Sequence, residues 1–383
     1  MIAIHRRRLL AGIVAAPVVG GGFRPAFARG AATPEAALDA AFVAHAPVGL
    51  AGAVATRDGL VWAGARGVRR FGGDEPVTIG DRWHLGSNTK AMTAAVFARL
   101  AEQGRARWGM PLAKAFPGVD IHPAWRNTTL DDFMHHRAGL RDEPVMGRSW
   151  LTTARADPRS LPEQRAAIAA QALGAPPGGT PGAFAYGNAN YVLVGAAIEA
   201  LAGRSWEDVI RAELFEPLGL ATAGFGAPAA GGEGAGNAWG HRGAGDNRTP
   251  MPPDHPGADN PAALGPAGTV HMDLADYGRF LAAMMGARPD WLGPDSRTRL
   301  TTPPEGGPPA YACGWAVGMQ PWAGRDDPVR VLGHNGSNTM WYCSVLAAPE
   351  AGVAFVAASN EGAAGERACQ DLLRGLAATW NEG

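Results

Sequence analysis

The sequence predicts a mixed α/β protein of the α+β type, in which an antiparallel sheet is built from both ends of the chain and flanked by helices. Two observations lead to this prediction. Strand-like patterns occur at residues 49–67 and again after residue 311, whereas residues 110–220 show helical spacing with turns rich in proline and glycine. Segregated strands and helices are typical of α+β folds, and the lack of βαβ alternation argues against a Rossmann or TIM-barrel layout. We therefore expect an all-helical subdomain inserted within the α/β part.

The elements of the α/β part follow from local patterns. Two apolar runs flank Asp58-Gly59 within residues 49–67, which is a strong hairpin signal. The next element is predicted to be a helix, because apolar residues recur at helical spacing, at Met92, Val96 and Leu100. Near the C-terminus we expect helices at 273–285 and 364–380, and between them strands at 311–319, 329–348 (with a bend near its middle) and 352–360.

These patterns also divide the chain. Residues 29–108 and 265–383 would form the α/β part of one domain, and residues 109–264 a helical insert with a long loop. Residues 226–268 are rich in glycine and proline and show little periodicity. A connection of this length inside a compact domain is often functional, so we expect it to border a cleft.

Residues 1–28 are predicted to be an export signal that is cleaved after Ala28. Three arginines at positions 6–8 are followed by an apolar run at 9–19 and by the small-residue pattern Ala26-Phe27-Ala28. The apolar run is too short to span a bilayer, which disfavours an uncleaved membrane anchor. The arginine run is compatible with twin-arginine export, although the rest of that motif is imperfect. We therefore expect a periplasmic or secreted mature protein.

Length and charge exclude several classes of partner. The 383 residues, 46% of them hydrophobic and 18% charged, are enough for one large core carrying an inserted subdomain. With a formal net charge of −1 and no basic block, the chain lacks the electrostatic footprint of a nucleic-acid-binding protein. No segment after the leader is long and apolar enough to be a membrane span. The sequence shows no internal repeat and leaves the oligomeric state open.

The three cysteines leave two alternatives open. Cys313 and Cys343 lie in strand-like runs and could pair across neighbouring strands after export, or all three, including Cys369, could be buried free thiols. Their spacing does not fit a zinc site, and the histidines have no carboxylates or thiolates at ligand spacing beside them. We therefore predict neither a metal nor a cofactor.

Ser87 and Lys90 are the first candidate catalytic pair. They stand three residues apart in GSNTK, at the start of the predicted helix, so their side chains meet on one helix face. Lys90 could take the proton of Ser87 if burial or another cation keeps the amine neutral near pH 7. The helix N-terminus would also direct free N–H groups at an oxyanion on an attacked carbonyl. The alternative is that Ser87 only caps the helix, and this motif alone does not decide between the two.

Two later motifs supply the other candidate site residues. In FAYGNANY, Tyr186 and Asn188 would project to the same side of an extended turn, unless they are a buried tyrosine and a helix cap. In LGHNGSN, His334 and Gly336 lie in a strand-like run, where the glycine would let a ligand approach the backbone. The N–H of Ser337 would then be a second oxyanion donor; the alternative is a bulge in an edge strand.

The three motifs, in the order Ser-x-x-Lys, Tyr-x-Asn and His-x-Gly, resemble those of the penicillin-recognising serine hydrolases. The resemblance extends over nearly the whole mature chain, through blocks such as TTLDDFMHHRAGL, PAGTVHMDLADYGRFL and YACGWAV. The nearest look-alikes are class C β-lactamases, DD-peptidases and the esterases that share their fold. The resemblance implies that fold and favours Ser87 as a nucleophile. Class A enzymes carry a glutamate and an asparagine after the second motif, and this chain has no such pair after Asn188.

The resemblance also implies a role for each motif residue. Ser87 would be the acylated nucleophile and Lys90 its base partner. Tyr186 would share the proton shuttle and help to activate the deacylating water, while Asn188 would bind the acyl side of the substrate. The backbone N–H groups of Ser87 and Ser337 would form the oxyanion hole.

His334 departs from the lactamase pattern. Class C β-lactamases and DD-peptidases usually carry a lysine at this position, and a lysine stays charged at pH 7. A histidine, with an unperturbed pKa of about 6.5, is mostly neutral there, so the grip on a substrate carboxylate is weakened. In this superfamily a histidine at this position is common among esterases, amidases and D-amino-acid peptidases.

Other histidines and aromatic residues carry weaker signals. His135 and His136 match a structural helix-end block of the family, and Tyr191 and Trp315 are interpreted as packing residues. His241 lies in the long loop, where it could line the cleft.

The sequence therefore predicts a serine hydrolase that forms an acyl-enzyme on an ester or amide substrate, with no more than weak β-lactam hydrolysis. Two alternatives remain: a D-stereospecific peptidase or DD-carboxypeptidase acting on cell-wall peptides, and a non-catalytic protein that binds acyl ligands. The intact Ser87, Lys90 and Tyr186 argue against the second alternative, because a binding protein does not need all three. The natural substrate is not identified, since specificity would lie in the long loop and the inserted helices.

Overall fold

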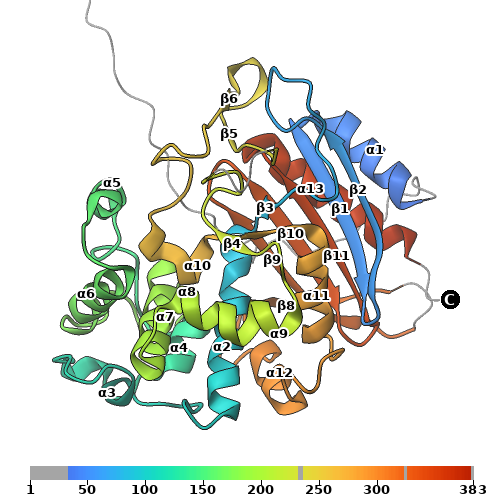
Figure 1. Cartoon of the computed structure of the whole chain (residues 1–383). Coiled ribbons are helices and arrows are strands. Elements are labelled where there is room, and N and C mark those ends of the chain that lie inside the picture. Colours follow the sequence, from blue (N-terminus) through green and yellow to red (C-terminus); the bar gives the residue numbers. More distant parts are fainter. Residues whose placement is uncertain (1–32, 232–235, 323–325, 381–383) are drawn as a thin grey trace, which may run out of the picture.

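An antiparallel sheet forms the centre of the molecule (Figure 1). The computed structural model describes residues 33–231, 236–322 and 326–380. Within these residues the sheet has six strands in the order β2-β1-β11-β10-β9-β8. They are β1 Gly49–Thr56, β2 Gly59–Gly67, β8 Ala316–Gln320, β9 Val329–Ser337, β10 Tyr342–Ala348 and β11 Val353–Ser359. The predicted fold class, with a sheet built from both ends of the chain, is confirmed.

Helices cover both faces of this sheet, which explains why its central strands β1 and β11 are buried almost throughout. One face packs on α1 Pro34–His45 and α13 Ala363–Thr379, and the other on α11 Leu274–Met284 and the turn that begins α2 Thr89–Glu102. Successive residues of a strand point to opposite faces. In β1, Leu50 and Val54 therefore belong to the hydrophobic core on the side of α1 and α13. Ala51 and Ala53 belong to the core on the side of α11 and α2.

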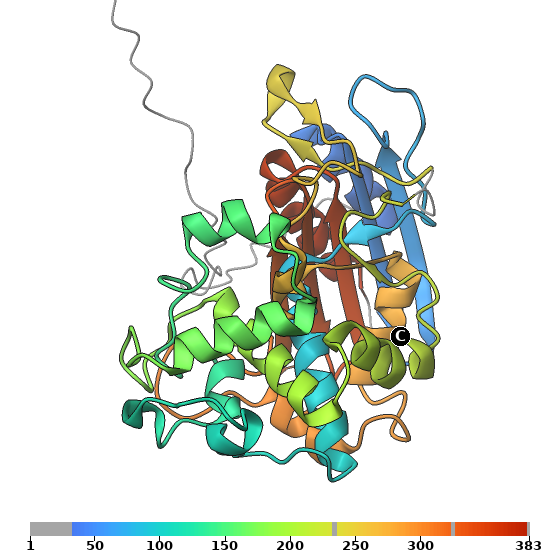
Figure 2. The same ribbon diagram turned by 60° about the vertical axis from the view of Figure 1, so that its left-hand side comes forward.

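The helical region lies to one side of the sheet, as Figures 1 and 2 both show. Its helices are α3 Leu112–Ala115, α4 Leu130–Met134, α5 Arg148–Thr153, α6 Leu161–Leu173, α7 Asn188–Ala202, α8 Trp206–Ile210 and α9 Glu216–Leu218, with a π-helical turn Arg211–Phe215 before α9. α2 contacts α7, α8 and the short α10 Gly265–Gly268. Every residue of α2 from Thr89 to Ala98 is buried, as expected of a helix packed on all sides. The segment with the candidate Ser-Lys pair is therefore central.

The long connection predicted at 226–268 is mostly irregular. Its strands β5 His241–Arg242 and β6 Thr249–Pro250 pair with each other, and nearby β4 Gly224–Phe225, β7 Val270–Met272 and β3 Trp83–His84 form a small separate sheet. α12 Pro294–Thr301 precedes β8. In the part of the chain that the structure describes, no helix is long and apolar enough to cross a membrane. The export signal expected at residues 1–28 lies outside the described residues.

One predicted strand is shorter than expected. The run at 311–319 becomes a strand only at Ala316, because Gly314 has a left-handed φ of +82° and forms a turn against α2. A Cβ on Gly314 would lie 2.4 Å from the backbone nitrogen of Ala91. The backbone at Gly314 approaches that of α2 so closely that only a glycine fits there. The same turn explains why the strand does not begin before Ala316.

The cysteines are all buried free thiols. Cys313 Sγ lies 3.4 Å from Nε2 of His135, and Cys343 lies on β10 between Gly336 and Ala358 of the neighbouring strands. Of the two alternatives, a Cys313–Cys343 disulfide and free thiols, the structure shows the second.

A buried ion-pair network holds the helical region together. The guanidinium of Arg165 on α6 pairs with Glu199 on α7 and Glu207 on α8. It also donates to the carbonyl oxygens of Ala263 and Ala262, at 3.1 and 3.2 Å, in the connection that leads to α10. Burial raises the pKa of Glu199 and Arg165 lowers it, so the charge of this carboxylate depends on the arginine.

Replacing Arg165 by alanine is expected to destabilise the protein by about 3–5 kcal/mol, because Glu199 would stay buried without its cation. Arg159→Ala is the matched control, since it removes an exposed pair with Asp157 and should leave the unfolding midpoint nearly unchanged. Urea unfolding of both variants measures the difference. Equal unfolding midpoints for the two variants would show that the buried ion-pair network does not stabilise the protein as expected.

Candidate active site

The turn that carries Ser87 connects β3 to α2. It is a single 3₁₀ turn, Gly86–Asn88, whose first residue has a left-handed φ of +52°. The side-chain amide of Asn88 donates to the carbonyl oxygens of Leu85, at 2.9 Å, and of Cys343 on β10, at 3.2 Å. The turn is thereby fixed to the sheet. Asn88 occupies the N-cap position of α2 without a side-chain cap, so the capping interpretation of Ser87 is not what the structure shows.

Lys90 lies at the start of α2 with its amine against Ser87. Its Nζ donates to three oxygens: Ser87 Oγ at 3.0 Å, Asn188 Oδ1 at 2.8 Å and the carbonyl oxygen of Ala267 at 2.8 Å. Burial lowers the pKa of Lys90 to about 7, although the negative charge of Asp142 opposes the shift. A substantial fraction of this amine is neutral at physiological pH, so the condition that the sequence set for Lys90 as a base is met.

Tyr186 and Asn188 approach the same amine from the start of α7. Lys90 Nζ lies 5.0 Å from the centre of the Tyr186 ring, and Asn188 is the first residue of α7, after Gly187 at the N-cap. Tyr186 is partly exposed as a residue, but burial raises the pKa of its hydroxyl, while a hydrogen bond with Ser87 lowers it. The phenol is therefore neutral at physiological pH. This leaves Lys90 as the group able to accept a proton.

The second candidate oxyanion donor lies on β9, packed directly on the turn of Ser87. A Cβ on Gly336 would fall 1.9 Å from the carbonyl oxygen of Leu85 and 2.7 Å from the backbone nitrogen of Ser87. A Cβ on Gly86 would fall 2.4 Å from the nitrogen of Ser337. The backbone nitrogens of Ser87 and Ser337 therefore belong to segments in direct contact, and glycine is required on both sides.

β9 is a regular strand at this point. It pairs with β10 through residues 332–337 and with β8 through residues 329–333. The pairing of β9 with β10 has no bulge. The bulged edge strand that was the alternative interpretation of LGHNGSN is therefore not observed. Among the described residues, the outer edge of 334–337 has no strand partner, and it lies beside the turn of Ser87.

Both ring nitrogens of His334 are hydrogen-bonded. Nδ1 lies 2.7 Å from the carbonyl oxygen of Asn335, and Nε2 lies 3.0 Å from the hydroxyl of Tyr311. Burial, together with the charge of Lys90, lowers the pKa of His334 to about 3. The ring is thus neutral near pH 7, as its residue type suggested.

Comparison with known proteins agrees with this geometry. A model of the Beta-lactamase family matches residues 35–379. The chain belongs to this family. An unguisins hydrolase from Aspergillus campestris is 26% identical over 300 residues, which are 74% of this chain and 53% of the relative. Penicillin-binding protein 4 from Amycolatopsis lactamdurans is 30% identical over 165 residues, 43% of this chain and 41% of the relative. The chain thus spans about half the length of the curated relatives it matches.

Solved structures of β-lactamase-like proteins share the fold. A D-stereospecific amidohydrolase from Streptomyces sp. matches with a TM-score of 0.66 at 24% identity, over 88% of this chain and 96% of that one. A penicillin-binding protein from Bacillus halodurans matches with a TM-score of 0.68 at 19% identity, over 86% and 96%. At these identities the likeness establishes the fold alone.

Two groups that act on Lys90 in this β-lactamase-family site were not predicted from the sequence. The carbonyl oxygen of Ala267 accepts one of the three hydrogen bonds of its amine. Asp142 accepts from the backbone nitrogen of Ala189, at 2.8 Å, and its charge raises the pKa of Lys90. A backbone carbonyl leaves no trace in a sequence, and Asp142 stands in no motif of recognisable spacing.

A cluster of aromatic rings surrounds Tyr186. The centre of the His136 ring lies 4.4 Å from that of Tyr186, and the rings of Tyr311 and His334 lie at 6.3 and 6.2 Å. His136 is buried, which lowers its pKa well below the usual value. Tyr311 is the first residue of YACGWAV, one of the blocks that resemble the family. That block could have pointed to Tyr311, but no role was predicted for it from the sequence.

His241, which could have lined the cleft, does not do so. Its side chain is fully buried, with Nδ1 2.8 Å from the carbonyl oxygen of Asn360 and Nε2 accepting from the backbone nitrogen of Phe71 at 2.9 Å. It joins the long connection to the end of β11 and is structural. Tyr191 and Trp315 are buried, in agreement with their prediction as packing residues.

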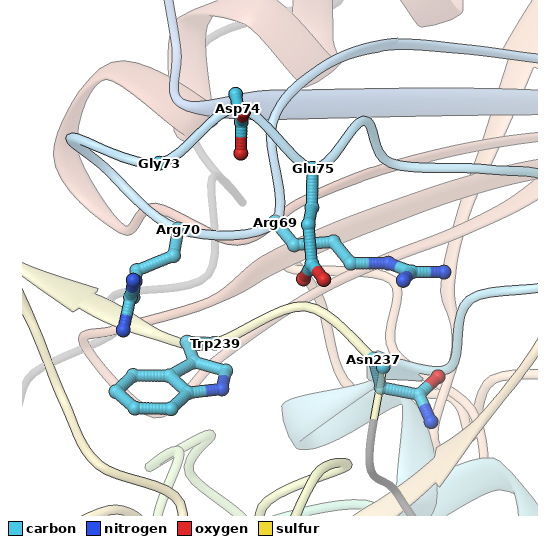
Figure 3. Close-up of a pocket in the computed structure, with 8 residues that line it drawn as sticks. Arg69, Arg70, Gly73, Asp74, Glu75, Asn237 and Trp239 are labelled. Atoms are coloured by element: carbon cyan, nitrogen blue, oxygen red, sulfur yellow. The ribbon is translucent and has the colours of Figure 1, made fainter.

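A separate surface pocket of about 350 Å³ lies between the loop after β2 and residues 236–239 (Figure 3). The guanidinium of Arg70 lies 5.2 Å from the centre of the Trp239 ring on its wall. The pocket contains neither Ser87 nor Lys90 among its lining residues, so it is not part of the catalytic site. Within residues 33–231, 236–322 and 326–380, no group of three or more His, Cys, Asp or Glu side chains is placed to hold a metal ion.

Gly336→Ala is expected to lower the unfolding free energy by about 1–3 kcal/mol, because the new Cβ would overlap the backbone around Ser87. The control is Gly318→Ala on β8, where the nearest atom to a new Cβ lies at 3.8 Å. Thermal unfolding of the two variants tests this contact. Equal transition temperatures would show that β9 does not press on the turn as described.

Asp142→Asn is expected to move the reactivity of Ser87 to lower pH. The carboxylate of Asp142 raises the pKa of Lys90, so its removal lowers that pKa, and the amine becomes neutral at a lower pH. The rate of Ser87 labelling by a fluorophosphonate, which rises through about pH 7 in the wild type if Lys90 is the base, should rise earlier in the variant. Asp246→Asn, at an exposed site, is the control. A shift toward higher pH, or none, would contradict the assignment.

Proposed function

We propose that this protein is a serine hydrolase in which Ser87 attacks an ester or amide carbonyl and forms an acyl-enzyme. One observation carries the proposal: Ser87 Oγ accepts a 3.0 Å hydrogen bond from a buried amine whose pKa is lowered to about 7. A serine beside an amine that can be neutral has a base for its proton. Burying a lysine is costly, and a lysine needed only for helix stability or solubility would lie at the surface.

In the acylation step, neutral Lys90 takes the proton of Ser87 while Oγ bonds to the carbonyl carbon of the substrate. The carbonyl oxygen becomes an oxyanion, which the N–H groups of Ser87 and Ser337 stabilise. When the tetrahedral intermediate collapses, the bond to the alcohol or amine breaks, and the leaving group takes the proton from Lys90. The neutral hydroxyl of Tyr186, hydrogen-bonded to Ser87, relays this proton.

In the deacylation step, a water molecule takes the place of the leaving group. Its oxygen attacks the acyl carbon as Lys90, through Tyr186, accepts one of its protons. Collapse of this second intermediate breaks the bond to Ser87 Oγ, which recovers a proton, and releases the acid. Asn188, whose Oδ1 holds the amine of Lys90, would donate from its Nδ2 to the acyl side of the substrate.

The neutral ring of His334 bears on the substrate class. With a pKa of about 3, it provides no cation for a substrate carboxylate of the kind that β-lactams carry. We therefore propose esters and amides as substrates, with only weak β-lactam hydrolysis. One relative is named as a hydrolase and another as a penicillin-binding protein, and both names support a hydrolase.

The alternative that a specific observation favours is hydrolysis of D-stereospecific peptides, including DD-carboxypeptidase activity. The edge of β9 at 334–337, which has no strand partner among the described residues, lies beside the turn of Ser87, where an extended peptide could add as a strand. The fold shared with a D-stereospecific amidohydrolase is compatible with this alternative. A panel of p-nitrophenyl esters, nitrocefin and D-Ala-D-Ala peptides separates the two proposals by their relative kcat/KM.

Ser87→Ala is expected to abolish turnover of every substrate in this panel while the thermal transition stays unchanged, because the side chain is small and its role is chemical. Intact-mass spectra after treatment with a fluorophosphonate should show one adduct on the wild type and none on this variant. Ser149→Ala, at an exposed serine on α5, is the control and should behave as the wild type. An unmodified wild type, or an adduct that survives Ser87→Ala, would remove Ser87 as the nucleophile.

A further inference from the structure

Tyr311 and His334 form a buried pair at the edge of the candidate site. The hydroxyl of Tyr311 lies 3.0 Å from Nε2 of His334, and the tyrosine is fully buried in the turn before β8. We propose that Tyr311 determines specificity: its hydroxyl occupies the histidine nitrogen that would otherwise meet a substrate carboxylate, so the site selects substrates that are uncharged at this position. This inference rests on the proposed hydrolase function and deepens it by naming the residue that sets the substrate charge.

Hydrogen-bond accounting at His334 is the first step. A neutral imidazole has one donor and one acceptor nitrogen. Nδ1 lies 2.7 Å from the carbonyl oxygen of Asn335, which can only accept, so Nδ1 carries the proton and Nε2 is the acceptor. The hydroxyl of Tyr311 then donates its single proton to Nε2. Neither residue has a proton left for a carboxylate, and the free lone pairs of the Tyr311 oxygen would repel one.

The charged and titratable groups around His334 reinforce this state. Lys90 on α2, His136 after α4, Tyr186 before α7 and Tyr311 before β8 face the ring. Burial of the ring is the main cause of the lowered pKa of His334, and the positive form of Lys90 adds to it by opposing a second cation. His136 is itself kept neutral by burial. No carboxylate of the described residues acts on His334, and the hydrogen bond to the backbone of Asn335, which favours the protonated form, is outweighed by burial and by the charge of Lys90.

The position of the Tyr311 hydroxyl is fixed by the surrounding structure. The guanidinium of Arg137 donates to the carbonyl oxygens of Gly182, at 2.8 Å, and of Gly307, at 2.7 Å, and so ties the loop ahead of Tyr311 to the helical region. The ring of Tyr311 also lies 5.0 Å, centre to centre, from that of His136. With the loop and the ring held in this way, Tyr311 keeps its hydroxyl on Nε2 of His334 and leaves no room there for a carboxylate.

Removing this hydroxyl should therefore change the charge preference. In Tyr311→Phe the ring keeps its packing, but Nε2 of His334 loses its donor. The neutral form of the histidine is then less favoured, its pKa rises, and an arriving carboxylate can meet a protonated Nε2. The gain is confined to mildly acidic pH, because Lys90 must still lose its proton to act as the base.

Matched chromogenic esters test the proposal. The reference is p-nitrophenyl butyrate, compared with p-nitrophenyl hemisuccinate (a carboxylate on the acyl side) and with the butyrate ester of 3-carboxy-4-nitrophenol (a carboxylate on the leaving side). In the wild type at pH 6, kcat/KM should strongly favour the neutral ester. In Tyr311→Phe, the ratio of kcat/KM for the neutral ester to kcat/KM for at least one of the charged esters should fall by about tenfold or more. A change of this size corresponds to one charge-assisted hydrogen bond. Unchanged ratios for both would overturn the proposal.

Two further variants control for packing and for charge. Tyr277→Phe removes a buried hydroxyl that has no hydrogen-bond partner among the described residues, and it should leave both ratios as in the wild type. His334→Lys introduces a permanent cation and should favour the charged esters throughout the range from pH 6 to 8. If Tyr277→Phe changed the ratios as much as Tyr311→Phe does, the effect would be general loosening of the core, and the proposal would fail.

A measurement without substrate separates this proposal from the proposed function. In ¹⁵N spectra of the ¹⁵N-histidine-labelled protein, assigned by His334→Gln, the wild type should show a protonated Nδ1 and an unprotonated Nε2 from pH 5 to 8. In Tyr311→Phe the ring should titrate at a higher pH than in the wild type. A wild-type ring protonated at Nε2 would overturn the role of Tyr311 even if the esters are hydrolysed. Failure of every ester to react would instead refute the hydrolase.

Discussion

The burial of one amine, that of Lys90, is the constraint on which the rest of the structure depends. A lysine can be taken out of water only if oxygen atoms replace the water molecules around it. Its three oxygens come from different elements: Ser87 from the turn before α2, Asn188 from α7 and Ala267 from α10. The sheet, the helical region and the connection after it must therefore meet around α2, and this explains why α2 is buried on all sides.

Burial acts with opposite sign on the acids and bases of the site. It lowers the pKa of Lys90 and of His334 and raises that of Tyr186, because in each case the charged form is the one that loses water. At physiological pH the phenol and the imidazole are thus neutral, and Lys90 alone among these three is near its titration point. The proposed division of labour, with Lys90 as a base that titrates and Tyr186 as a relay that does not, would follow from the same physical cause.

The sequence predicted what depends on local pattern and on motif order. The hairpin at 49–67, the helix after Ser87 and the meeting of Ser87, Lys90 and Asn188 agree with the structure. The strand predicted from residue 311 begins only at Ala316, because its start depends on how closely α2 approaches. The hydrogen bond from Tyr311 to His334 was not predictable for a related reason: it joins side chains whose neighbourhood exists only after the helical region has packed on the sheet.

The contact between Gly86 and β9 also decides when the proposed site around Ser87 is complete. Ser87 and Lys90 sit on one short segment near the start of the domain, whereas Ser337 belongs to strands near its end. A chain whose last strands have not yet docked has a serine and a lysine side by side but only half of the proposed oxyanion hole. Full reactivity of the proposed site would therefore require that β9 has docked on the turn of Ser87. An unfinished molecule would carry its nucleophile in a dormant form.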